Sequence, residues 1–336
     1  MDELYNVSTS PHIRGGATTA ALMRDVIIAL CLPSAFGIYV FGWRAAMIIA
    51  VAVASCVLTE YLWDLFIKRA PSLGDGSAIV TGLILALNLP STVPVWVPVL
   101  GSVFAILVVK QFFGGLGQNF MNPALAARCF LLISFARIMT DFPVIDGVTT
   151  ATPLALLRSG TITDPLTMLI GTHSGVIGET CAVAILIAGI FMIIRKVISI
   201  RIPLSYIGSF IVFVVVFKLI GEGALPTFDY LVVQLCGGGL LLGAFFMATD
   251  YVTSPITGTG KIIYGIVLGL LTALFRFFGS SAEGVSYAIL VGNVVSPLIE
   301  KWTVPKAFGT DRKSIAAAEA LKKQAAGGAD ASGKKA

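Results

Sequence analysis

The side chains best suited to chemistry lie together in one polar segment, residues 146–153, with the sequence DGVTTATP. It opens with an Asp-Gly pair typical of turns, in which Gly147 permits backbone angles that other residues avoid. Pro153 then fixes the backbone that follows Thr152. A threonine hydroxyl held in such a turn can accept a phosphate ester. An ordinary threonine-rich loop is the simpler explanation of the same residues, so the segment alone leaves both interpretations open.

The composition of the surrounding chain indicates a membrane protein. Of its 336 residues, 57% are hydrophobic and only 12% are charged, and the mean hydropathy is +0.92. Apolar runs of about 20 residues are typical of transmembrane helices, whereas a β-barrel would show alternating segments. The net charge of +5 is better explained by cytoplasmic Lys and Arg than by nucleic-acid binding. No cleavable signal is visible, so the first apolar span is expected to be retained.

The predicted fold class is all-α, a polytopic membrane protein with about ten transmembrane helices. The third apolar span is too short to cross a bilayer and ends at Asn88-Leu89-Pro90, where the proline stops a helix. Short or broken helices are tolerated at membrane depth where they are buried in protein or line a cavity. The expected spans are residues 25–41, 45–67, 78–89, 93–113, 123–138, 179–194, 203–220, 230–248, 262–278 and 285–299.

The two halves of the membrane portion share a pattern. Gly82 to Asn88 in the third span has a counterpart in Gly243 to Asp250 of the eighth. An N-x-x-[NS]-P element opens the fifth span at Asn119 and recurs in the tenth at Asn293. Interruptions at matching positions are typical of inverted repeats around a site at the membrane midplane. We therefore expect two repeats of five helices, each with a broken third helix.

The distribution of Lys and Arg predicts the orientation of these helices. With the N-terminus in the cytoplasm, most basic residues fall in the inner loops and most acidic ones outside, with Arg44 and Arg158 as exceptions. Both termini are then cytoplasmic and residues 146–153 lie outside. The expected organisation is a cytoplasmic arm (1–24), a first membrane repeat (25–138), an extracytoplasmic loop (139–178), a second repeat (179–300) and a disordered cytoplasmic tail (301–336).

Several stretches resemble the membrane subunits of the Rnf and sodium-pumping NADH:quinone reductase complexes. The segment at residues 146–152 resembles the flavinylation signature D-G-x-[ST]-x-A-T of that family. Ser10-Pro11-His12 resembles its N-terminus, residues 75–90 its third helix, and FGGLGQNFMNPA at residues 113–124 the loop into its fifth. Together these stretches span nearly the whole membrane portion. The compact N-terminal arm favours the D subunits of the Rnf branch.

The resemblance implies a covalent FMN. A flavin transferase would take FMN from FAD and join it through a phosphodiester bond to Thr152. The same alignment assigns the acceptor loop to Asp146, Gly147, Thr149 and Ala151. The family most often has glycine where this chain has Thr150, so Thr149 and Thr150 remain alternative acceptors. A second, noncovalent flavin such as riboflavin also stays open.

The resemblance further implies a subunit that relays electrons between ferredoxin and NAD, coupled to translocation of Na⁺ or H⁺. Its partners would be the A, B, C, E and G subunits of the complex, in a bacterial or archaeal cytoplasmic membrane. Its fold would resemble that of urea transporters. The chain shows no nucleotide-binding domain and no cysteine cluster, so it is expected to act as an internal relay. A solute channel or transporter and a structural scaffold are the competing hypotheses.

Polar residues inside apolar spans are the remaining candidates, because they are costly in a membrane. Their ordinary roles are ion pairing or snorkelling at helix ends. Asp64 is expected to pair with Lys68, and Lys218 and Arg276 are expected to snorkel or to form ion pairs of their own. A subset expected near the repeat axis could line a cavity, bind a second flavin or pass a cation: Asn88, Asn119, Asn122, Arg128, Asp250 and Asn293.

The cysteines and histidines indicate no metal centre. The five cysteines fall within apolar spans without a C-x-x-C pair, as expected of small buried hydrophobic residues. His12 and His173 both lie outside these spans, which argues against a haem held between two helices.

Overall fold

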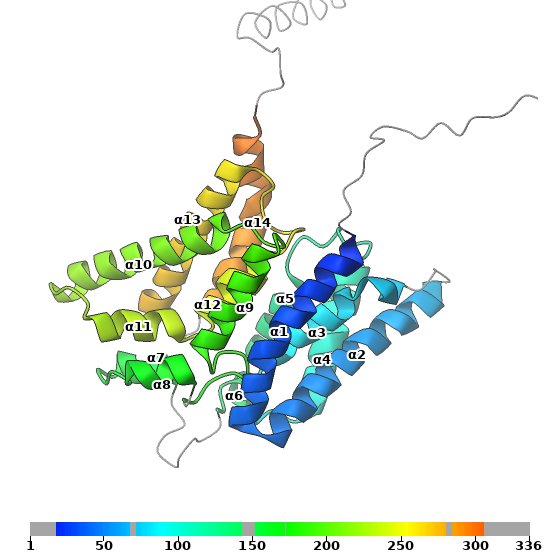
Figure 1. Ribbon diagram of the computed structural model, residues 1–336, viewed down its shortest axis with the longest axis horizontal. Helices are drawn as coiled ribbons and strands as arrows, with labels where there is room; N and C mark the ends of the chain where they lie inside the picture. The colour runs from blue at the N-terminus through cyan, green and yellow to red at the C-terminus, as the bar shows by residue number, and fades with distance from the viewer. Residues whose placement is uncertain (1–17, 68–71, 143–151, 172, 280–283, 306–336) are drawn as a thin grey trace, which may run out of the picture.

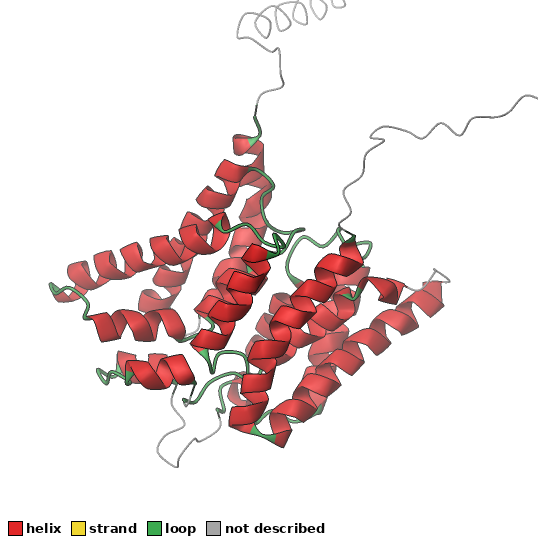
Figure 2. Cartoon of the chain, in the orientation of Figure 1, coloured by secondary structure: helices red, strands yellow, loops and turns green. Residues whose placement is uncertain are grey.

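A computed structural model describes residues 18–67, 72–142, 152–171, 173–279 and 284–305, and within them every regular element is helical (Figure 2). Short 3₁₀ and π-helical segments occupy Ser72–Asp75, Phe104–Gln111 and Gly243–Met247. The α-helices are α1 (Thr19–Phe41), α2 (Trp43–Ile67), α3 (Ser77–Leu87), α4 (Trp96–Val103), α5 (Pro123–Ser134), α6 (Ala136–Met139), α7 (Pro153–Arg158), α8 (Pro165–Ile170), α9 (Ala182–Ile194), α10 (Arg201–Glu222), α11 (Phe228–Cys236), α12 (Leu240–Leu242), α13 (Gly258–Phe278) and α14 (Val285–Thr303).

The helices form two groups that meet along a seam (Figure 1). Helices α1 to α6 make one group, and α7 to α14 make the other. At the seam α1 packs against α9, and α5 contacts α14. The first and last long helices of one group therefore meet the first and last long helices of the other.

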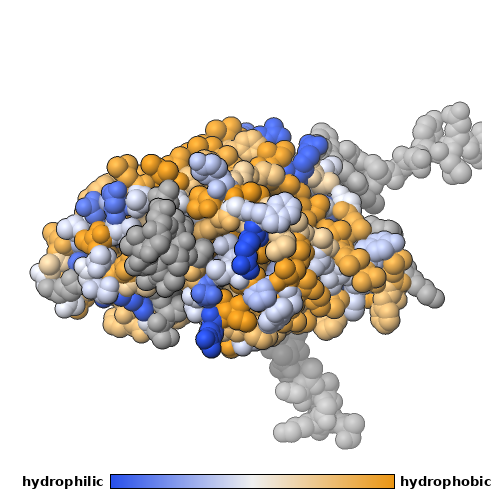
Figure 3. Space-filling model, turned by 90° about the horizontal axis from the view of Figure 1, so that it is seen from below, coloured by the Kyte–Doolittle hydropathy of each residue, from blue (hydrophilic) through white to orange (hydrophobic). Residues whose placement is uncertain are grey.

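The membrane prediction is confirmed at a coarse level. Four of the described helices are long and apolar enough to span a bilayer, and a fifth span is reached if α11 and residues 240–247, bent by 57°, count together. Every predicted span overlaps at least one helix. Apolar residues cover much of the surface seen from below in Figure 3. The number ten and the repeat relation remain predictions.

The start of the first helix differs from its prediction. Hydropathy placed the boundary between the arm and the first span at Asp25, whereas α1 begins at Thr19. The hydroxyl of Thr18 accepts a hydrogen bond from the backbone N–H of Ala21 at 3.2 Å, which caps the helix in the polar segment. Hydropathy alone does not detect such a cap.

The second group contains a close helix pair, α10 and α13. A Cβ placed on Gly265 would collide with the Ser205 side chain, and one on Gly269 would collide with the Ser209 side chain. This G-x-x-x-G spacing is a means by which membrane helices approach closely. In the first group Gly82 of α3 plays a similar part, since its Cβ would lie 2.7 Å from the Cα of Val53 on α2.

Candidate functional site

Thr152 stands at the entrance of helix α7. Its backbone is extended (φ −68°, ψ 155°), and its hydroxyl accepts from the N–H of Ala155 at 3.4 Å as the N-cap. Pro153 occupies the first turn, where its missing N–H costs nothing. The side chain of Thr152 is buried, with 7% exposed. The other residues predicted for the acceptor loop lie outside the described residues: Asp146, Gly147, Thr149, Thr150 and Ala151.

A cavity of about 570 Å³ lies beside α7. Its size falls in the range of about 300–1,000 Å³ usual for small-molecule sites. Cationic residues come to it from three different helices, Arg158 from α7, Lys218 from α10 and Arg276 from α13. Its other lining residues are Leu154, Leu157, Gly160, Ile162, Tyr230, Gln234, Phe277 and Gly279.

The Arg276 guanidinium is held in place by backbone and amide oxygens. It donates to the backbone and side-chain oxygens of Gln234, the latter at 3.1 Å, and to the carbonyl of Gly237 at 2.8 Å. It also lies over the ring of Phe210, 5.0 Å from its centroid. The side chain is 4% exposed. Its charge therefore sits at a fixed place in the wall of the cavity.

The other two cations, Arg158 and Lys218, also have fixed contacts beside the cavity. Arg158 donates to the carbonyls of Arg276 at 2.7 Å and Gly279 at 3.0 Å, which ties the end of α7 to the end of α13. Lys218 lies 3.8 Å from the centroid of the Tyr230 ring. The sequence predicted snorkelling or ion pairing for Lys218 and Arg276, and it did not predict that they share a cavity with Arg158.

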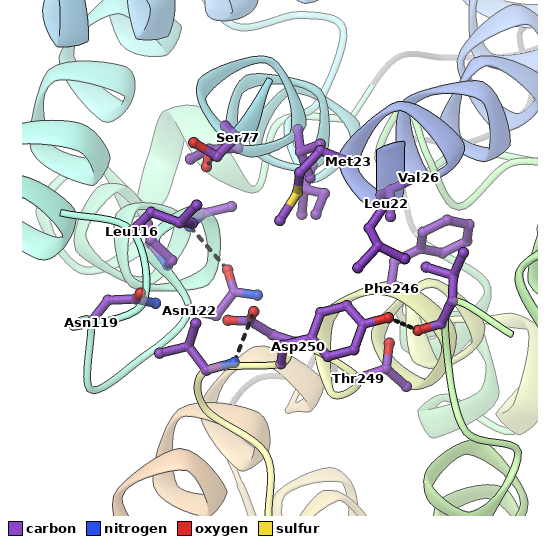
Figure 4. A pocket seen from close by; sticks show the side chains of 18 of the residues that line it. Leu22, Met23, Val26, Ser77, Leu116, Asn119, Asn122, Phe246, Thr249 and Asp250 are labelled. Atoms are coloured by element: carbon purple, nitrogen blue, oxygen red, sulfur yellow. Dashed lines mark hydrogen bonds between the residues drawn. The ribbon is translucent and has the colours of Figure 1, made fainter. Parts of the chain in front are cut away.

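A second pocket, of about 110 Å³, lies between the two helix groups. Asn119, Asn122 and Asp250, three of the residues predicted near the repeat axis, line it together (Figure 4). Asn122 caps α5 by accepting from the N–H of Ala124 at 3.1 Å, and its amide donates across the seam to the carbonyl of Met247 at 3.4 Å. These polar residues thus join α5 to the end of the π-helical turn of the other group.

The other three predicted residues lie near this pocket without lining it. Arg128 of α5 donates to Asn88 at 2.9 Å and to Ser286 of α14 at 2.7 Å, so it joins the two groups. Asn293 shares a hydrogen bond of 2.8 Å with the Tyr264 hydroxyl. The set is therefore divided between a pocket and a bridge across the seam.

A buried ion pair was missed in the sequence. Lys110, one of the basic residues expected in the inner loops, is 2% exposed and contacts both carboxylate oxygens of Glu60, at 2.8 and 2.9 Å. It also donates to the hydroxyl of Ser77 at 2.6 Å, at the start of α3. The signal was present, because Glu60 lies within an apolar span and a charge there needs a partner.

Asp64 belongs to the same cluster. It accepts from the N–H and the hydroxyl of Ser72, at 2.8 and 2.9 Å. Its predicted partner Lys68 lies outside the described residues.

Within the described part of the chain, His, Cys, Asp and Glu side chains form no cluster that could hold a metal ion. Cys56, Cys129, Cys181 and Cys236 are buried as predicted, whereas Cys31 is exposed. His173 is buried with 5% exposed, and this burial lowers its pKa to about 4. The imidazole is therefore neutral at physiological pH.

Comparison with known proteins gives consistent matches over nearly the whole chain. The model of the NQR2, RnfD, RnfE family matches residues 6–309. The D subunit of the Na⁺-translocating ferredoxin:NAD⁺ oxidoreductase complex of Acetobacterium woodii is 47% identical, over 93% of this chain and 98% of the relative.

Two further relatives are also D subunits of such oxidoreductase complexes. The D subunit of the proton-translocating ferredoxin:NAD⁺ oxidoreductase complex of Clostridium ljungdahlii is 38% identical, over 92% of this chain and 97% of the relative. The D subunit of an ion-translocating oxidoreductase complex of Actinobacillus succinogenes is 34% identical, with coverages of 91% and 98%.

Proposed function

Because the chain belongs to the NQR2, RnfD, RnfE family, we propose that it is the D subunit of an ion-translocating ferredoxin:NAD⁺ oxidoreductase complex. It relays electrons within that complex through FMN bound covalently to Thr152. The observation that carries the proposal is the 47% identity, over nearly the full length of both chains, to the D subunit of such a complex. The relatives' names favour this function over a solute channel.

Attachment of the flavin requires a threonine hydroxyl whose position is set by the local backbone conformation. In the proposed reaction the Oγ1 of Thr152 bonds to the FMN phosphorus of FAD, the pyrophosphate bond breaks, and AMP leaves with the hydroxyl proton released. Asp146, Gly147, Thr149 and Ala151 shape the acceptor loop for the flavin transferase. When bound, the flavin supplies transfer of electrons singly or in pairs, and the protein supplies position and electrostatics.

The residues around α7 suit such a group. The cavity of about 570 Å³ combines three cationic side chains with the amide of Gln234 and apolar surface from Leu154 and Phe277. Phosphate and ring carbonyl oxygens are groups that guanidinium and ammonium donors bind well. Because only 7% of the Thr152 surface is exposed, Thr152 must become more accessible before the transferase can modify it.

The wider organisation follows from the same proposal. The A, B, C, E and G subunits of the complex are its partners in the cytoplasmic membrane of a bacterium or archaeon. The Lys and Arg distribution supports cytoplasmic termini and an external Thr152. The coupling ion is Na⁺ or H⁺, the ions for which the relatives from Acetobacterium woodii and Clostridium ljungdahlii are named.

Paired features of the two groups support the inverted repeats with broken third helices and ten spans. Gly76 (φ +75°) precedes α3 and Gly239 (φ +68°) precedes α12, each in the left-handed conformation. A second flavin is the weaker proposal. The pocket with Asn119, Asn122 and Asp250 measures about 110 Å³, below the range of about 300–1,000 Å³ usual for such ligands, and would have to widen.

The test is in-gel flavin fluorescence after denaturation, with the chain coexpressed with a flavin transferase. Wild type and Thr152→Ser are expected to fluoresce, because both carry a hydroxyl, and Thr152→Ala is expected to be dark. Fluorescence that persists in Thr152→Ala moves the acceptor to Thr149 or Thr150. A dark wild type contradicts the flavin proposal.

A further inference from the structure

We propose that the cavity bounded by α7, α10, α11 and α13 holds the flavin carried by Thr152, and that Arg158, Lys218 and Arg276 raise the flavin's reduction potential there. This inference rests on the proposed function, and it assigns to three cations a role that the attachment motif does not contain.

The connection between Thr152 and the cavity is short and rigid. Leu154, two residues after Thr152, and Leu157 on the next turn both line the cavity. Leu154 also packs on the helix break, since a Cβ on Gly237 would lie 3.1 Å from its Cγ. A group attached to the N-cap of α7 is thus tethered within one helical turn of the cavity wall.

The opposite end of α7 is fixed to the cavity as well. Arg158 binds the carbonyls of Arg276 and Gly279 at the end of α13. Because α7 is only six residues long, both of its ends lie close to the same cavity. The helix that carries the acceptor and the wall that carries the cations therefore form one packed unit.

The charges of the cavity match the charge that a flavin acquires. The oxidised ring takes up two electrons and one proton to give a reduced anion, with the negative charge on its pyrimidine side. Positive charge near that side stabilises the reduced form and raises the potential. Arg276 is preorganised for this by the Gln234 and Gly237 oxygens, and Lys218 is placed by the Tyr230 ring.

The experiment measures the potential of the tethered flavin in the purified full-length chain, by anaerobic titration with dithionite followed by absorbance. The variants are Lys218→Met and Arg158→Gln, which remove a charge, and Lys218→Arg, which keeps it. Arg44→Gln is the matched control, because Arg44 also binds a carbonyl, that of Thr92, but lies away from this cavity. Denaturing-gel fluorescence measures flavin loading in each variant.

We expect equal loading throughout, a more negative potential in Lys218→Met and Arg158→Gln, and the wild-type potential in Lys218→Arg and Arg44→Gln. Loaded flavin with an unchanged potential in both charge-removing variants overturns the inference and leaves the proposed function intact. If those variants instead lose a copurifying anionic phospholipid, measured by lipid mass spectrometry, at an unchanged potential, the cavity binds a lipid headgroup and the inference is wrong. Absence of covalent flavin in wild type contradicts the proposed function itself.

Discussion

The starts of α3 and α12, one in each helix group, use the same backbone device with different electrostatics. Each begins after a left-handed glycine, Gly76 or Gly239. Each also receives a buried cation from a neighbouring helical segment. Lys110 donates to the hydroxyl of Ser77 at 2.6 Å, and Arg276 donates to the carbonyl of Gly237 at 2.8 Å.

The two regions differ in the groups that contact the buried cation. At α3 the carboxylate of Glu60 pairs directly with Lys110. At α12 the buried carboxylate of Glu179 accepts from the backbone N–H of Gly238, and Arg276 donates to the carbonyls of Gln234 and Gly237. Both cations border a pocket, Lys110 the one of about 110 Å³ and Arg276 the one of about 570 Å³. The first region thus has a compact ion pair beside a small pocket, and the second has cations in the wall of the larger cavity, where we propose that the flavin lies.

The largest expected effect is on the ion pair. Lys110→Met leaves the Glu60 carboxylate buried without its cation, which should cost about 3–5 kcal/mol of stability. Thermal unfolding of the purified chain in detergent measures the loss. The double variant Glu60→Gln with Lys110→Met should recover part of it, because no buried charge remains. A single variant as stable as wild type would show that the two regions do not differ as described.

The close packing of α10 and α13 should be the next most sensitive feature. Gly269→Leu places a large side chain against Ser209 and the backbone of Phe210, and such overpacking typically costs about 1–3 kcal/mol. Gly208→Leu is the matched control on the same pair, since no atom lies within 4 Å of a Cβ at Gly208. Equal unfolding temperatures for the two leucine variants would argue against close packing at this G-x-x-x-G spacing.

Acid should destabilise the second helix group, α7 to α14, through His173, which lies between α8 and α9. Burial lowers its folded pKa to about 4, whereas an unfolded histidine titrates near pH 6.5. Between these values the unfolded chain binds the proton and the folded chain does not, so stability is lost as the pH falls from 6.5 towards 4.

The expected loss from this residue is about 2 kcal/mol at pH 5. Unfolding temperatures recorded between pH 7 and pH 5 measure it, and His173→Gln should show a smaller decline over that window. An identical decline in wild type and variant would refute the assignment to His173.

The smallest effects on stability should come from substituting the left-handed glycines Gly76 and Gly239, the feature that the two regions share. Gly76→Ala and Gly239→Ala each force a Cβ into the left-handed conformation, at a cost of about 1–2 kcal/mol. Neither meets a steric clash, since the closest contact at Gly76 is 3.6 Å and Gly239 has none within 4 Å. Gly221→Ala, in open space on α10, serves as the control. A large difference between the first two variants would weaken the repeat relation.

Much of the fold could be predicted because it depends on local pattern. Apolar runs predicted where helices lie, and Asn88-Leu89-Pro90 predicted the end of α3 to within two residues. The start of α1 escaped prediction because the Thr18 cap extends the helix into a polar stretch. Of the polar residues predicted near the repeat axis, Asn119, Asn122 and Asp250 line one pocket.

The parts that could not be predicted depend on pairing over distance. Glu60 and Lys110 are 50 residues apart, and no local pattern relates them. Arg158, Lys218 and Arg276 come to one cavity from α7, α10 and α13, helices that are far apart in the sequence. Hydropathy treats each of these residues as an isolated charge near a helix end, which is why the cavity was missed.

Peptide mass spectrometry of the wild-type chain, coexpressed with a flavin transferase and digested after denaturation, tests the central claim most directly. The account predicts a peptide containing residues 146–153 that carries the mass of FMN less one water, with fragment ions that place the added mass on Thr152. The same peptide found only unmodified, or modified at Thr149 or Thr150 with Thr152 free, would contradict it.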